Sequence, residues 1–355
     1  MKDRLHCTDG VLLSRRAFNG VLLWLLSSGQ AAPADAFGWD NTIFARGINL
    51  PSASFNDEHV PGLYGTDYIY PSAKDLQYYA RKGFSVVRLP YLWERLQHSL
   101  FEPLDAAELG RIKTVLAAAR TLKMRVILSP HNFGRYHING KPTLIGTEDV
   151  SVSSFADFSY KVAAAFAGDD AIYGLSLMNE PHDSQGLWKQ TAQAGLGAIR
   201  QADPERLVLA PGDHWSSAYS WRQYNEDFLL RDPASHVMYE AHQYFDADRT
   251  GTYKVGYSLS GASPSRGVEW ISPFVQWLKQ YRQRGIITEF GVPNSDPQWR
   301  VLLQHVLVYL AQEKIPWTYW AGGPRWGNYQ LSVEPTNGTD VSLMAALVDN
   351  YGMRP

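Results

Sequence analysis

Cysteine is almost absent from this chain of 355 residues, which contains only Cys7. Cys7 lies ahead of an apolar run at 21–26 that follows a pair of arginines, the pattern of an N-terminal export signal. Small residues at 34–36 offer a cleavage site, so we predict an export signal peptide over residues 1–36. Its removal would leave no thiol, which excludes disulfides, thiol catalysis and cysteine metal sites.

Two export routes fit this signal. Arg15 and Arg16 before the apolar run are typical of a twin-arginine signal, but a basic segment in that place is equally common in general secretory signals. The apolar run is too short to remain as a membrane-spanning anchor, so we expect no integral membrane segment in the mature chain. Either route predicts an exported protein, periplasmic or extracellular.

An excess of charge of either sign is also missing. Charged residues make up 19% of the chain, the formal net charge is −2, and no lysine- or arginine-rich block follows residue 16. Nucleic acids and anionic membrane surfaces are therefore poor candidate partners. Low-complexity tracts are absent, and apolar residues reach 45% of the chain. This composition predicts a globular protein with a sizeable core.

Eight continuous apolar runs predict strands that are buried on both faces, as in a parallel sheet. They lie at 44–50, 85–90, 125–131, 172–181, 206–213, 236–244, 285–291 and 316–323. Helical patterns between them predict helices at 72–81, 104–122, 155–166, 184–202, 274–284, 298–312 and 342–350, and a further one within 217–230. Eightfold alternation of strand and helix predicts an α/β fold, a single (β/α)8 TIM barrel over residues 37–355.

The predicted helices and loops carry two further signals. Asp105 and Glu108 at the start of the 104–122 helix predict a reciprocal capping box. Four long segments rich in Gly, Ser, Asn and Tyr follow strands on their carboxyl side, and all four should rim one end of the barrel. These loops span residues 51–71, 133–151, 245–270 and 324–340.

Two of the predicted strands end in a glutamate, Glu180 and Glu289. A strand-end glutamate on its own is commonly a helix cap or a surface ion pair. Two of them at the carboxyl edge of a parallel barrel, where such folds hold their chemistry, favour a catalytic pair. Glycoside hydrolysis needs one carboxyl group as proton donor and one as nucleophile, about 5–5.5 Å apart when configuration is retained. We therefore predict that these two side chains face each other.

Other strand-end residues predict a shell around the pair. Arg88 and the hydroxyl of Tyr244 can stabilise an ionised Glu289. Asn179, beside Glu180, can bind the 2-hydroxyl of a sugar, a contact that strengthens in the transition state. Each of these residues alone has an ordinary structural explanation, and their placement at successive strand ends is what indicates a site.

His131 and His242 also fall at strand ends and could be read as metal ligands. No HExxH motif, cysteine cluster or suitably spaced third histidine accompanies them, so we predict hydrogen bonds to the sugar or the carboxylates and no metal. Trp320 should lie under the bond that is cut. Four more tryptophans are candidates for stacking on sugar, but packing in the core explains a tryptophan equally well, so both interpretations stay open for them. They are Trp93, Trp215, Trp221 and Trp326.

These residues stand in motifs that resemble glycoside hydrolase family 5. The motifs are RLP at 88–90, HNF at 131–133, LMNEPHD at 177–183, HQY at 242–244, TEFG at 288–291, and Trp320. Three stretches, at 179–183, 211–215 and 245–252, are similar to the endo-β-1,4-glucanase branch that includes fungal endoglucanases. The resemblance implies Glu180 as acid/base and Glu289 as nucleophile. It implies a surrounding site of Arg88, His131, Asn179, His242, Tyr244 and Trp320.

The chain departs from that branch at two points. Phe290-Gly291-Val292-Pro293 follows the second glutamate where the branch often has glycines, and the disulfides common in the branch cannot form. Subsite loops decide substrate preference, and the family also includes mannanases and other β-glycanases. Substrate preference is therefore the property that these departures leave open.

We predict a retaining endo-β-1,4-glucanase that hydrolyses cellulose-type β-glucan by double displacement. It would need no cofactor, and we expect a monomer whose partner is a β-linked polysaccharide or oligosaccharide. One alternative is a family 5 glycanase that acts on mannan or a bacterial exopolysaccharide, with or without transglycosylation. An alternative of another class is a non-hydrolytic carbohydrate-binding barrel.

Overall fold

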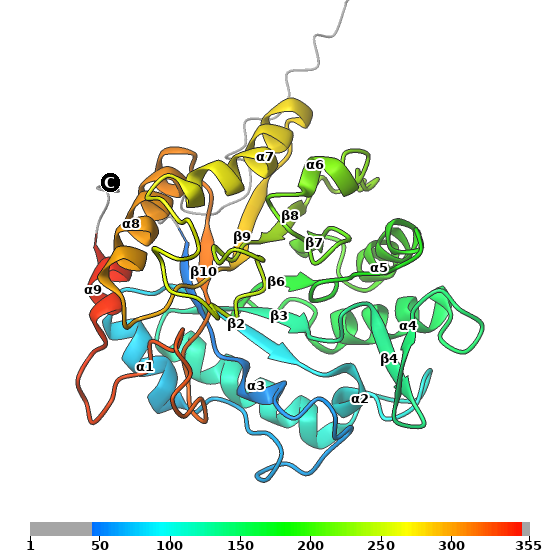
Figure 1. Ribbon diagram of the computed structural model, residues 1–355. Helices are drawn as coiled ribbons and strands as arrows, with labels where there is room; N and C mark the ends of the chain where they lie inside the picture. The colour runs from blue at the N-terminus through cyan, green and yellow to red at the C-terminus, as the bar shows by residue number, and fades with distance from the viewer. Residues whose placement is uncertain (1–44, 350–355) are drawn as a thin grey trace, which may run out of the picture. The chain divides into compact units, whose positions relative to one another are not determined.

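A computed structural model describes residues 45–349, and within them eight parallel strands close into a barrel. Figure 1 shows these strands in a ring with the helices around it. In chain order they are β1 (Arg46–Asn49), β2 (Val86–Tyr91), β3 (Arg125–Pro130), β6 (Ile172–Ser176), β7 (Val208–Pro211), β8 (Val237–His242), β9 (Gly285–Glu289) and β10 (Trp317–Tyr319). Each strand pairs with its sequence neighbours in the barrel, and β10 pairs with β1. All eight predicted strands and the (β/α)8 barrel are confirmed.

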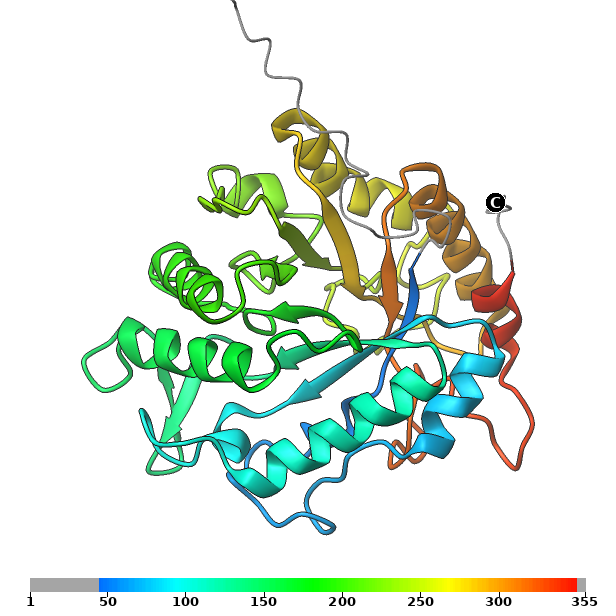
Figure 2. The ribbon, with the colours of Figure 1, turned by 180° about the vertical axis from the view of Figure 1, so that it is seen from behind.

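The helices cover the outside of this barrel, as the view from behind in Figure 2 shows. They are α1 (Ala73–Arg81), α2 (Trp93–Leu96), α3 (Ala106–Thr121), α4 (Val152–Ala165), α5 (Trp188–Ala202), α6 (Trp221–Tyr224), α7 (Arg266–Tyr281), α8 (Pro297–Gln312) and α9 (Ser342–Val348). A 3-10 turn, η1 (Pro51–Ala53), follows β1. The predicted start of α7 was wrong by eight residues, because Pro273 lies inside this helix rather than at its boundary.

The start of α3 also corrects one prediction. The Asp105 side chain caps the helix by accepting a hydrogen bond from the Glu108 backbone N–H at 2.8 Å. The reciprocal bond is missing because the buried Glu108 carboxylate accepts the hydroxyl hydrogens of Tyr68 and Tyr70, each at 2.7 Å. These two hydrogen bonds from residues distant in the sequence replace the local capping bond, and they connect the loop after β1 to α3.

The segment 133–151, predicted as a loop, contains an antiparallel hairpin of β4 (Arg135–Ile138) and β5 (Lys141–Leu144). The hairpin lies outside the barrel sheet and follows β3. Since all barrel strands run parallel, this segment and the other loops on their carboxyl side meet at one end of the barrel. Strands β2, β6 and β9 are buried along their whole length, so their ends hold side chains in fixed places.

The export signal predicted for residues 1–36 lies outside the described residues. Within residues 45–349, we find no helix with the length and apolar character needed to cross a membrane.

Candidate active site

Glu180 and Glu289 meet at the carboxyl end of the barrel. Glu289 is the last residue of β9, and Glu180 lies on the loop after β6 with a φ of 41°, a left-handed backbone that is uncommon for a residue other than glycine. Such strain is concentrated at functional sites. The facing carboxylate oxygens lie within 4.8 Å of each other. This separation is close to the spacing of retaining glycosidases and too small for the water that an inverting enzyme places between its carboxyl groups.

The carboxylate of Glu289 is held on both of its oxygens. Arg88 donates to Oε2 from Nη1 at 3.1 Å, and the Tyr244 hydroxyl donates to Oε1 at 2.6 Å. Burial raises the pKa of Glu289 above its ordinary value, and the positive charges of His242 and Arg88 oppose that rise. The two donors also fix the orientation of the carboxylate, which leaves it aimed into the site.

Arg88 connects this carboxylate to the loop that carries Glu180. Its guanidinium is fully buried and donates to Oδ1 of Asn49 at 3.0 Å and to Oδ1 of Asn179 at 2.7 Å. The Asn179 amide in turn donates to Nε2 of His131 at 3.2 Å. Burial lowers the pKa of His131 well below its usual range, so this ring is neutral and can accept. Arg88 therefore sets the position of Asn179, the residue next to Glu180.

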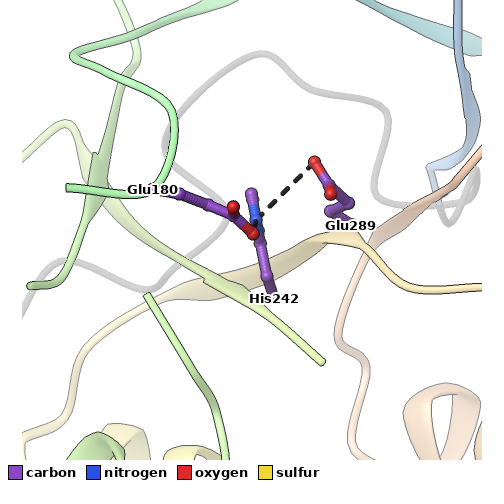
Figure 3. Close-up of side chains that lie close together, drawn as sticks. All are labelled: Glu180, His242 and Glu289. Atoms are coloured by element: carbon purple, nitrogen blue, oxygen red, sulfur yellow. Dashed lines mark hydrogen bonds and ion pairs between the residues drawn. The ribbon is translucent and has the colours of Figure 1, made fainter. Parts of the chain in front are cut away.

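His242 lies between the two carboxylates (Figure 3). A β-bulge at the end of β8 shifts the register so that His242 pairs with Glu289. Its Nδ1 lies 2.8 Å from Oε1 of Glu180 and 3.7 Å from Oε2 of Glu289. Burial disfavours a charge on this ring, but the negative charges of Glu289 and Glu180 outweigh it and raise the pKa of His242 to about 9.

This charge predicts a pH-dependent stability. The pKa of about 9 in the folded state exceeds the value of about 6.5 in the unfolded chain, so folding binds His242 in its protonated form. The stabilisation is complete below about pH 6.5 and is lost as the pH rises through 9. We expect the difference in unfolding free energy between the wild type and His242→Asn, measured by urea denaturation, to shrink from pH 6 to pH 9. A difference that stays constant over this range would mean that the folded ring is neutral.

Glu180, His242 and Glu289 are also the three residues, among those described, whose donor atoms lie close enough together to hold a metal ion. The guanidinium of Arg88 lies 3.1 Å from the Glu289 carboxylate, and its charge would repel a cation. Tyr244 and Arg88 already use both oxygens of that carboxylate. The arrangement therefore suits proton transfer and nucleophilic attack, and we assign no metal to it.

A family model described as cellulase (glycosyl hydrolase family 5) matches residues 44–325. The chain belongs to glycosyl hydrolase family 5. It is therefore an O-glycoside hydrolase, and the family resemblance read from the motifs is confirmed.

Named relatives and solved structures cover most of this family 5 chain. The probable endo-β-1,4-glucanase B of Aspergillus oryzae is 33% identical, over 86% of this chain and 89% of its own length. The crystal structure of Pseudomonas stutzeri endoglucanase Cel5A in complex with cellobiose is 39% identical with a TM-score of 0.83, and the match covers 87% of this chain and 92% of that one. XacCel5A in complex with cellopentaose is 37% identical with a TM-score of 0.81, over 86% and 99%.

The predicted aromatic residues of this family 5 enzyme separate into two groups. Trp320 and Trp326 line a cavity of about 600 Å³, in which His131 lies parallel to the Trp320 ring at 5.6 Å. Trp215 is 49% exposed and stacks on His182 with a centroid distance of 3.5 Å. Its backbone N–H donates to the carbonyl of Pro181, so it lies beside the Glu180 loop. These three rings are at least partly exposed.

Trp93 and Trp221 are not available to a ligand, so of the two interpretations left open for them core packing holds and sugar stacking is ruled out. Both side chains are fully buried. Trp93 stacks on Phe158 at 4.7 Å, and Trp221 packs edge-on against Trp277 at 5.4 Å. Each ring fills space between the barrel and its helices, where apolar burial stabilises the fold.

Four polar residues next to the site were missed in the sequence. They are all buried, and each hydrogen-bonds to Arg88 or to a residue that contacts Arg88 or His242: Asn49, Ser176, Glu240 and Thr288. A signal existed for Glu240, because it lies two residues before His242 on one strand and side chains at that spacing share a face. Asn49 could have been found as a polar residue near the end of a predicted buried strand.

Proposed function

We propose that this enzyme is a retaining endo-β-1,4-glucanase that hydrolyses cellulose-type β-glucan, with Glu289 as nucleophile and Glu180 as acid and base. The observation that carries the proposal is the approach of their oxygens to within 4.8 Å at the carboxyl end of the barrel. The relatives named endo-β-1,4-glucanase, and the similar structures solved with cellobiose and cellopentaose, support the choice of substrate.

The reaction proceeds in two displacements. In the first, an oxygen of Glu289 bonds to the anomeric carbon while the glycosidic bond breaks, and Glu180 gives its proton to the leaving oxygen. In the second, water attacks the anomeric carbon, Glu180 takes a proton from it, and the bond to Glu289 breaks. Arg88 and Tyr244 hold Glu289 in line for attack, and they stabilise it again when it leaves as a carboxylate.

The aromatic residues favour attack within a chain rather than at its end. Trp320 and Trp326 line the cavity, and Trp215 is exposed beside the Glu180 loop. Because Glu180 protonates the leaving group, a ring beside it suits the sugar that departs. Flat rings stack on the apolar faces of sugars, and binding sugars on both sides of the cut is what an endo-acting enzyme needs.

The test is hydrolysis of a panel of purified polysaccharides: carboxymethylcellulose, a mixed-linkage β-glucan, mannan and a bacterial exopolysaccharide. We expect release of mixed cello-oligosaccharides from the first two, and NMR of the first product should show the β-anomer. A preference for mannan or exopolysaccharide would mean that the same two glutamates act on a glycan other than β-1,4-glucan. An α-anomer as first product would refute retention, and binding without new reducing ends would leave only a carbohydrate-binding barrel.

Trp215→Ala should weaken binding on the leaving-group side. Loss of one stacked ring predicts a rise in KM for cello-oligosaccharides of about tenfold, with a smaller change in kcat, because aromatic stacking is worth roughly 0.5–1.5 kcal/mol beyond area burial. Trp215→Phe keeps a ring and should retain most of the affinity. Tyr160→Ala removes an aromatic side chain of similar exposure, 44%, from α4 on the outside of the barrel and should change neither constant. Equal KM values for Trp215→Ala and the wild type would remove Trp215 from the binding surface.

Location and assembly complete the proposal. The predicted signal over residues 1–36 would direct the enzyme to the periplasm or the extracellular space, where polymeric glucan is met. We propose that it acts as a monomer, because the two glutamates and the residues that hold them come from one chain. We propose no nucleic-acid partner, because the net charge is −2 and no basic block follows residue 16. Sedimentation of the mature protein, and its recovery from cell fractions, would test both points.

A further inference from the structure

A third carboxylate, Glu240, lies beneath the catalytic pair and has no role in the mechanism above. It is fully buried on β8. Its Oε2 accepts the Ser176 hydroxyl hydrogen at 2.6 Å, its Oε1 accepts that of Thr288 at 2.5 Å, and Nη2 of Arg88 lies 3.3 Å from Oε1. Burial raises the pKa of Glu240, but the charges of Arg88 and His242 and the hydrogen bond from Ser176 together outweigh this and hold the pKa below its ordinary value. Glu240 is therefore an ionised acceptor of hydrogen bonds.

The hydroxyl of Thr288 links this carboxylate to His242. It has one hydrogen, which it donates to Glu240. Nε2 of His242 lies 2.9 Å from the same hydroxyl oxygen, which can then only accept. Nε2 must therefore carry a hydrogen in both the neutral and the charged ring.

The other ring nitrogen, Nδ1, faces Oε1 of Glu180 at 2.8 Å. One proton fits between them, either on Nδ1 with Glu180 ionised or on Glu180 with the ring neutral. The second arrangement is the form in which Glu180 can act as an acid. We propose that Glu240 is a positioning residue: through the Thr288 hydroxyl it keeps Nε2 of His242 protonated, so that the proton His242 exchanges is the one it shares with Glu180. This rests on the proposed role of Glu180 as acid and base.

The consequence is clearest when the shared proton is removed. A free imidazole could then move its remaining hydrogen to Nδ1 and donate it to the Glu180 carboxylate, which would stabilise the form that cannot act as an acid. In this site that tautomer would turn a bare Nε2 toward the lone pairs of Thr288. The bare Nδ1 instead faces the carboxylate, and their repulsion favours return of the proton.

Titratable and charged groups from five parts of the fold surround His242, and all but the neutral His131 ring bring a charge to the shared proton. They are Arg88 on β2, His131 after β3, Glu180 after β6, Glu240 on β8 itself and Glu289 on β9. Arg88 contacts both Glu240 and Glu289, so its positive charge stabilises both carboxylates. Without the charge of Glu240, Arg88 would act on the nucleophile Glu289 alone. Removal of the negative charge of Glu240 should make the site more positive.

Thr288→Val tests the proposal because it removes the hydroxyl and keeps the shape. We expect the basic limb of the pH profile of kcat/KM to move to lower pH by about one unit, the size expected from losing one hydrogen bond to a charged group. The acid limb, set by Glu289, should stay in place. Thr288→Ser, which keeps the hydroxyl, should retain both limbs. A lower rate with both limbs unmoved in Thr288→Val would mean a merely structural hydroxyl and would overturn the proposal.

Two further measurements separate this proposal from the proposed function. Nitrogen-15 NMR of the His242 ring does not need activity: we expect a hydrogen on Nε2 throughout the titration in the wild type, and the Nδ1–H tautomer at high pH in Thr288→Val. Glu240→Gln removes the charge with little change of shape and should also lower the basic limb, even if Thr288→Val fails to fold. A wild type without glucanase activity would refute the proposed function. A wild-type ring that adopts the Nδ1–H tautomer would refute this inference alone.

Discussion

Glu289→Ala is expected to abolish hydrolysis of carboxymethylcellulose, with kcat lower by about 10⁴-fold or more, as for other nucleophiles that act within a coupled catalytic unit. The variant loses the atom that bonds to the anomeric carbon, and no other described side chain can replace it. The Glu180 carboxylate lies within 4.8 Å of Glu289, but its Oε1 is held 2.8 Å from Nδ1 of His242 and does not occupy the position of Glu289. Reducing-end release over a range of enzyme concentrations measures the loss.

Azide distinguishes loss of the nucleophile from general damage. With an activated aryl cellobioside, azide can enter the space left by the Glu289 carboxylate and attack the anomeric carbon once. A single displacement inverts the centre, so the expected product is the α-glycosyl azide. Glu205→Ala is the matched control, because Glu205 is 80% exposed on the turn that precedes β7 at the other end of the barrel. Near-normal turnover by Glu289→Ala, or a β-azide as product, would refute the assignment of the nucleophile.

The barrel and the carboxylate pair could be predicted from the sequence for one physical reason. Strands buried on both faces are continuously apolar, so each strand can be recognised in the sequence as an apolar run. Polar residues at the end of such a run lie at the carboxyl edge of the barrel. Glu289 ends β9 and Glu180 lies on the loop after β6, as predicted. Arg88, predicted at a strand end, instead lies inside β2 with three strand residues after it. Their meeting in space follows from the closure of the sheet rather than from any local pattern.

The remaining parts of the site depend on contacts that no local pattern contains. Trp93 and Trp221 differ from Trp215 only in what packs over them. Glu108 has the spacing of a reciprocal cap, but its carboxylate accepts hydrogen bonds from two tyrosine hydroxyls about 40 residues away in the sequence. Glu240 lies inside an apolar run, where a charged residue is tolerated only with partners. Arg88, Ser176 and Thr288 come from three other strands, so their joint position is known only once the barrel has closed.

Glu180→Gln is expected to lose activity in a way that depends on the leaving group. On oligosaccharides, kcat/KM should fall by about 10²–10⁴-fold, the usual contribution of a positioned proton donor. A 2,4-dinitrophenyl cellobioside needs no proton to leave, so the glycosyl enzyme should still form quickly on Glu289. Its hydrolysis needs Glu180 as a base and becomes rate-limiting. Stopped-flow absorbance should then show a burst of dinitrophenolate equal to the enzyme concentration.

The second half of the reaction supplies the decisive comparison. Azide needs no base, so it should restore turnover of the dinitrophenyl substrate by Glu180→Gln and give the β-glycosyl azide, the result of two displacements. Asp183→Asn neutralises a carboxylate three residues along that is 81% exposed, and Asn accepts the positive φ of 47° at that position. It should behave as the wild type on both substrates. If Glu180→Gln slowed both substrates equally and showed no burst, the proton on its carboxyl group would not be the one that reaches the leaving oxygen, and another acid would have to be found.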